Sequence, residues 1–155
     1  MNKYIVGTVV ILLAAAGSVF LYTHTKGEEE SLTPEYAKTT VIINNTAFVS
    51  DIADIEALRT LGLSGRETLG KNEAMLFVFD DEAPRSFWMK DMYFPLDIVW
   101  INSEKRIVDI SKDLQPESYP ETFSPSSPAQ YVLEIRAGLS DEKGFKEGDR
   151  VEFSL

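Results

Sequence analysis

The sequence predicts an α+β fold, a mainly antiparallel β-sheet curled into a small barrel or sandwich with one main amphipathic helix, preceded by a single N-terminal transmembrane helix. Many short β-branched or aromatic runs follow residue 39, only one stretch has apolar residues at helical spacing, and residues 4–22 carry no charge. We therefore expect a membrane anchor or signal segment at 1–22, a polar linker at 23–38 and a β-rich globular domain at 39–155.

The segment from Tyr4 to Tyr22 has the length of a membrane span. Its nineteen residues would form a helix of roughly 28 Å at about 1.5 Å per residue, close to the thickness of the hydrocarbon core. Lys3 precedes the segment and a run of glutamates at 28–30 follows it, which favours a cytoplasmic N-terminus. We expect one pass through the cytoplasmic membrane, with the globular domain on the extracytoplasmic side.

A cleaved signal peptide is the main alternative for this segment. Residues 14–16 are three alanines, the small residue type found at cleavage sites. Apolar residues 19–22 continue past them, whereas the apolar region of a signal peptide usually ends before its cleavage site. An uncleaved anchor is therefore favoured, an exported soluble form follows if cleavage occurs, and a buried soluble helix is the third interpretation.

The first part of the globular domain predicts a hairpin and a helix. Residues 39–44 and 46–52 are two strand-like runs, and Asn44–Asn45 between them is typical of a tight turn. In residues 51–63 the apolar side chains recur at helical spacing and Gly62 stands where a helix would end. We expect one amphipathic helix there.

The rest of the domain predicts further strands and one long loop. Residues 102–105 have the composition of a hairpin turn. Residues 111–129 contain four prolines, which exclude a helix and predict an irregular surface loop. The runs that we interpret as strands are 75–79, 87–89, 97–101, 106–110, 130–136 and 150–153.

The composition excludes several classes of function. A net charge of −10 without a basic stripe would repel a phosphate backbone, so we expect no nucleic-acid binding. The chain has no cysteine and its one histidine, His24, lies beside the apolar segment. Familiar catalytic triads and zinc sites therefore cannot form in the domain. We expect no metal and no cofactor, and an enzyme would depend on carboxylates, lysine, tyrosine or serine.

Trp88 and Lys90 are the first candidate ligand-binding residues. Strand alternation places them on one face and Phe87 and Met89 on the other. The indole of Trp88 can stack on an apolar or sugar-like ring while the ammonium of Lys90 meets an anion. Ordinary core packing with a solvated Lys90 is the alternative.

Asp97 and Glu134 are the candidate acidic residues. Asp97 begins a strand and can accept hydrogen bonds from the backbone of a turn. Glu134 lies in an apolar run, so its burial would require a partner such as Arg66, Lys90 or Arg136. A structural ion pair or turn cap is one interpretation of the two acids, and a carboxylate pair of a hydrolase is another.

Several blocks of sequence resemble the prokaryotic family catalogued as domain of unknown function 192. The resemblance runs from about Phe48 to Phe153 and rests on MLFVF at 75–79, FWMKDMYFPLDIVWI at 87–101 and YVLEIRAG at 131–138. It implies a compact β-rich domain that is often found behind a signal or membrane anchor. It implies no established activity.

These observations predict a membrane-anchored, noncatalytic ligand-binding or accessory domain. Its groove would lie near Trp88, Lys90, Asp97 and Glu134, with Arg66 as a further ligand-binding candidate. Its ligand would be a saccharide or another small molecule, a cell-envelope fragment, or a protein partner. A carboxylate-dependent hydrolase using Asp97 and Glu134 and a purely structural partner of a membrane protein are the alternatives.

Overall fold

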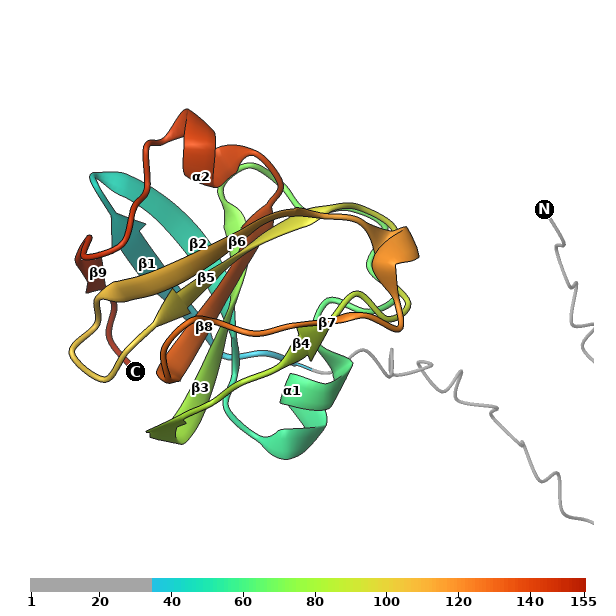
Figure 1. Ribbon diagram of the computed structural model, residues 1–155, viewed down its shortest axis with the longest axis horizontal. Coiled ribbons are helices and arrows are strands. Elements are labelled where there is room, and N and C mark those ends of the chain that lie inside the picture. Colours follow the sequence, from blue (N-terminus) through green and yellow to red (C-terminus); the bar gives the residue numbers. More distant parts are fainter. Residues whose placement is uncertain (1–34) are drawn as a thin grey trace, which may run out of the picture. The chain divides into compact units, whose positions relative to one another are not determined.

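The computed structural model describes residues 35–155 (Figure 1). The expected membrane segment from Tyr4 to Tyr22 lies outside the described residues, and within 35–155 no helix has the length and apolar character needed to cross a bilayer. The elements are β1 (Lys38–Ile43), β2 (Thr46–Ala53), α1 (Glu56–Leu61), β3 (Glu73–Ala83), β4 (Phe87–Trp88), β5 (Leu96–Ile101), β6 (Ile107–Leu114), the 3-10 turn η1 (Pro116–Ser118), β7 (Thr122–Phe123), β8 (Ala129–Arg136), α2 (Leu139–Glu142) and β9 (Val151–Glu152).

Seven strands form one curled sheet in the order β6-β5-β8-β3-β2-β1-β9, and β4 pairs separately with β7. The pair β2–β3 is parallel and the other pairs are antiparallel. The two edges of the sheet meet at one end, where the Ile107 amide donates to the Asp149 carbonyl at 3.0 Å and the Val151 amide donates to the Lys105 carbonyl at 2.9 Å. The expected mainly antiparallel, curled sheet is therefore confirmed as a half-barrel.

Two apolar clusters cover the two faces of this sheet. The inner cluster includes Phe48, Leu76 and Leu133 and fills the curl. The outer cluster includes Phe77 and Trp100 and is covered by α1, the residues after it and the β4–β7 pair (Figure 1). All six residues of β5 are buried, because this strand has an apolar layer on each face. The outer layer creates the site described below.

The predicted helix over residues 51–63 is much shorter in the structure. Asp51 and Ile52 belong to β2, where they pair with Met75 and Leu76 of β3. Their amides and carbonyls are committed to the sheet, so α1 begins only at Glu56. Gly62 ends the helix with a φ of 53°, as its position in the sequence predicts.

The proline-rich stretch is more ordered than the predicted loop. β6 continues to Leu114, and the following chain forms η1 and then β7. Phe123 of β7 pairs with Phe87 of β4 and packs against the outer cluster. The prolines exclude a helix but permit this short strand, which lies over the outer face of the sheet.

The described end of the expected linker contacts the domain. Tyr36 packs against the outer cluster, and its hydroxyl donates to the Gly62 carbonyl at 3.4 Å. The neighbouring Ala37 carbonyl accepts a hydrogen bond from the Ile52 amide at 2.8 Å. These residues thus form part of the outer layer.

Candidate functional site

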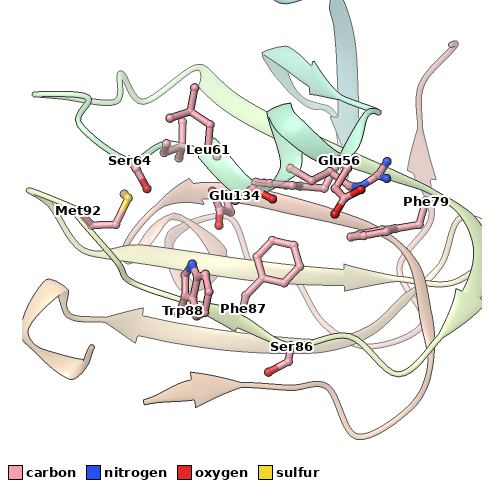
Figure 2. Close-up of a pocket in the computed structure, with 14 residues that line it drawn as sticks. Glu56, Leu61, Ser64, Phe79, Ser86, Phe87, Trp88, Met92 and Glu134 are labelled. Carbon is pink, nitrogen blue, oxygen red and sulfur yellow. The ribbon is translucent and has the colours of Figure 1, made fainter. Parts of the chain in front are cut away.

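A pocket of about 320 Å³ lies on the outer face between α1 and β4. One wall is formed by α1 and the residues that follow it, including Leu61, and the opposite wall by Phe87 and Trp88 of β4. Phe79 of β3 closes one side, and Glu134 of β8 lies between the walls (Figure 2). The pocket is therefore an aromatic cavity with one acid at its floor.

Glu134 is buried because its strand runs through the middle of the sheet. Its cross-strand neighbours are Met75 on β3 and Ile98 on β5, both members of the outer cluster. Only 5% of the residue is exposed, and its Oε2 atom has no hydrogen-bond partner among the described residues. Burial raises the pKa of Glu134 to about 8, against the opposing attraction of Arg66. At neutral pH the side chain is mainly a protonated acid with unused hydrogen-bonding capacity.

Arg66 is committed to a different acid. Its Nη2 donates to Oδ2 of Asp51 at 2.7 Å, and its guanidinium lies over the Tyr36 ring, 5.2 Å from the ring centre. Asp51 also accepts a hydrogen bond from Lys38. Burial pushes the pKa of Asp51 upward, but Lys38 and Arg66 outweigh it and hold the pKa below its usual value. Arg66, one of the three candidate partners of Glu134, therefore pairs with Asp51 instead.

Asp97 lies on the opposite face of the sheet from Glu134. Within the β5–β8 register Asp97 pairs with Ile135, whereas Glu134 pairs with Ile98, so strand alternation points the two carboxylates in opposite directions. Asp97 is fully buried and accepts hydrogen bonds from the Asp113 amide at 2.9 Å, the Ser140 amide at 3.0 Å and the Ser140 hydroxyl at 2.6 Å. It therefore joins β6 and α2 to β5, and the structure does not form the carboxylate pair of the hydrolase hypothesis.

Trp88 lines this pocket and Lys90 does not. Trp88 lines the pocket, is 49% exposed and makes an edge contact with Tyr119 at 6.3 Å between ring centres. Lys90 is exposed, lies beyond the end of β4 and is absent from the lining of this pocket; its carbonyl accepts a hydrogen bond from the Ser64 hydroxyl at 2.8 Å. Of the five expected site residues, Trp88 and Glu134 are the two that the pocket brings together.

Phe87, Phe79 and Leu61 line the pocket but were not expected as site residues. The sequence signals only burial for Phe87 and Phe79, because a pocket wall and a core position have the same apolar character. Leu61 is 40% exposed at the end of a helix that buries none of its residues, a feature that only the structure shows. Within residues 35–155, no group of three or more acidic or imidazole side chains could hold a metal ion.

Comparisons with known proteins agree with this fold. The model of the DUF192 family, described as "Uncharacterized ACR", matches residues 39–153. The UPF0127 protein TK1120 of Thermococcus kodakarensis is 31% identical over 85 residues, which are 54% of this chain and 52% of the relative. The chain therefore spans about half the length of this curated relative.

Two solved structures are similar to the chain. One, from Sinorhizobium meliloti 1021, is described as a candidate transcription regulator and is 31% identical, with a TM-score of 0.72 over 77% of this chain and 96% of that one. The other, a protein of unknown function from Novosphingobium aromaticivorans, is 32% identical, with a TM-score of 0.68 over 76% and 84%. Because the family model covers most of its length, the chain belongs to the DUF192 family of uncharacterised proteins.

Proposed function

We propose that this protein is a noncatalytic binding domain for a small, ring-containing ligand, held at the outer face of the cytoplasmic membrane by residues 4–22. The observation that carries the proposal is the floor of the pocket, where Glu134 is buried and its Oε2 has no hydrogen-bond partner among residues 35–155. An unsatisfied buried polar group costs about 1–3 kcal/mol. A ligand that forms a hydrogen bond with this atom would remove that cost, which favours binding in the pocket.

The walls of the pocket support a ligand with a flat apolar part. Phe87 is held by edge contacts with Phe77 at 4.8 Å and with Trp100 at 5.4 Å between ring centres. Trp88 stands half-exposed beside it at the mouth. Aromatic side chains in such positions stack on ligand rings, and the volume of about 320 Å³ lies at the small end of the range for small-molecule sites, about 300–1,000 Å³.

The same features favour binding over catalysis. Asp97, the expected second carboxylate, faces the opposite side of the sheet and is fully bonded there. Glu134 thus has no carboxylate partner from β5 with which to divide acid and base roles. The similar Sinorhizobium meliloti protein is described as a candidate transcription regulator, but the net charge of −10 of this chain weighs against binding to DNA here.

The test is ligand binding to the full chain in a nonionic detergent. We expect benzyl alcohol or a related one-ring probe to raise the melting temperature saturably. Leu61→Phe, which adds bulk to the pocket wall, should remove the effect. Ile55→Phe is the matched control, because Ile55 is 56% exposed next to the same helix and does not line the pocket. Equal stabilisation of both variants would contradict the proposal.

A further inference from the structure

We propose that the ligand of this pocket carries a positively charged amine, which pairs with the carboxylate of Glu134 while its apolar part packs between Phe87 and Trp88. This inference rests on the proposed binding function and adds the chemical class of the ligand. Its basis is the balance of charged groups around the cavity (Figure 2).

The charged side chains that line the pocket are two acids and one base. Glu134 lies at the floor, and Glu56 and Arg59 belong to α1. The guanidinium of Arg59 is hydrogen-bonded to the backbone: it donates to the Val78 carbonyl at 2.9 Å and to the Asp54 carbonyl. Arg66, whose charge acts on Glu134, is paired with Asp51. Among residues 35–155, the buried carboxyl group of the pocket therefore forms no ion pair.

The aromatic walls also suit a cation. The face of an aromatic ring carries partial negative charge and attracts ammonium groups, most strongly in indole. Phe87 and Trp88 lie on one side of the Glu134 carboxyl group (Figure 2), so an amine at the floor would meet a carboxylate and ring faces together. An anionic ligand would instead meet two carboxyl groups and the same ring faces. The net charge of −10 further favours the approach of a cation.

Amine binding should depend on pH in a defined direction. Burial raises the pKa of Glu134 to about 8; the charged groups around it are Arg66, which opposes this rise, and Arg59 and Glu56 of the pocket lining. An amine binds the ionised form, so its apparent affinity scales with the ionised fraction. That fraction rises about 50-fold between pH 6 and pH 8. A neutral alcohol can accept a hydrogen bond from the protonated acid, so its affinity should stay constant or fall over this range.

The experiment follows the two tryptophans of the full chain, Trp88 and Trp100, by ¹⁹F NMR after labelling with 5-fluorotryptophan. Trp88→Phe assigns the signals, and benzylamine, benzyl alcohol and benzoate are matched probes. We expect benzylamine to shift the Trp88 signal saturably and to bind about tenfold more tightly than benzyl alcohol at pH 8. Its affinity should be about 50-fold lower at pH 6.

Benzyl alcohol binding as tightly as benzylamine at pH 8, or a pH-independent benzylamine affinity, would overturn the amine assignment and leave the binding function standing. Failure of all three probes to shift Trp88 saturably would overturn both.

Two variants locate the charge partner. Glu134→Gln keeps the shape of the side chain but cannot ionise, so benzylamine should lose its advantage over benzyl alcohol. Glu121→Gln removes an exposed carboxyl group that does not line the pocket and should preserve that advantage. Loss of the advantage in Glu121→Gln as well would show that overall charge rather than Glu134 selects the amine and would overturn the assignment. The pH titration needs no variant, so the inference remains testable if Glu134→Gln fails to fold.

Discussion

Replacing Glu134 by glutamine should stabilise the protein by an amount that grows with pH. Burial raises the pKa of Glu134 from its usual 4.5 to about 8. Between these values the folded state keeps a proton that the unfolded chain has released, so stability falls as the pH rises. Each pH unit in this window costs about 1.4 kcal/mol. From pH 5 to pH 8 the sum is about 3.5 kcal/mol, and the loss ends above the folded pKa.

The assay is urea unfolding of the full chain in a nonionic detergent at pH 5 and pH 8. The free energy of unfolding of Glu134→Gln minus that of the unaltered chain should be about 3.5 kcal/mol larger at pH 8 than at pH 5. Glu56→Gln serves as the control, because it also removes one acid from the pocket lining but leaves the buried one in place. An equal difference between Glu134→Gln and the unaltered chain at both pH values would refute the reasoning that burial of Glu134 governs its ionisation.

Three further predictions concern the other expected residues and the anchor. Asp97→Ala should lower the free energy of unfolding by about 3 kcal/mol, because it leaves the Ser140 and Asp113 donors unpaired. Thermal or urea unfolding measures this loss, and a loss no larger than that of an exposed Asp→Ala change would contradict the structural role. Trp88→Ala should keep the melting temperature within a few degrees, because the residue is 49% exposed, yet weaken binding of benzyl alcohol; unchanged binding would remove Trp88 from the site. The full chain should stay in the membrane pellet after alkaline washing, whereas a chain lacking residues 4–22 should not, and release of the intact chain would contradict an anchor.

Local patterns in the sequence were enough for most of the strands. Asn44–Asn45 forms the predicted hairpin turn with positive φ at both residues, because a two-residue turn of this type requires residues that tolerate that conformation. The turn at 102–105 and the strand runs were found in the same way. The helix over 51–63 was overestimated because Ile52 fits a helical stripe and a strand face equally well. In the structure Ile52 pairs with Leu76 of β3 and is therefore part of a strand.

For the candidate site too, the sequence identified individual residues but not the contacts between them. The sequence alone identified Trp88 and Glu134 as unusual residues, since an acid in an apolar run and a tryptophan beside a lysine stand out against their neighbours. It could not show that Asp97 and Glu134 face opposite sides, because that depends on the register between β5 and β8. Nor could it show that Arg66 pairs with Asp51 and not with Glu134.

The sequence by itself therefore determined the family, the strand-rich character and the unusual sequence surroundings of a few side chains, because these depend on neighbours along the chain. Only the tertiary structure decided which of those side chains meet. A pocket is formed by residues as distant in sequence as Leu61 and Glu134, and their approach follows from how a second layer packs on a curled sheet. Burial of Glu134 beneath that layer, rather than its identity alone, is what makes it a candidate for ligand binding.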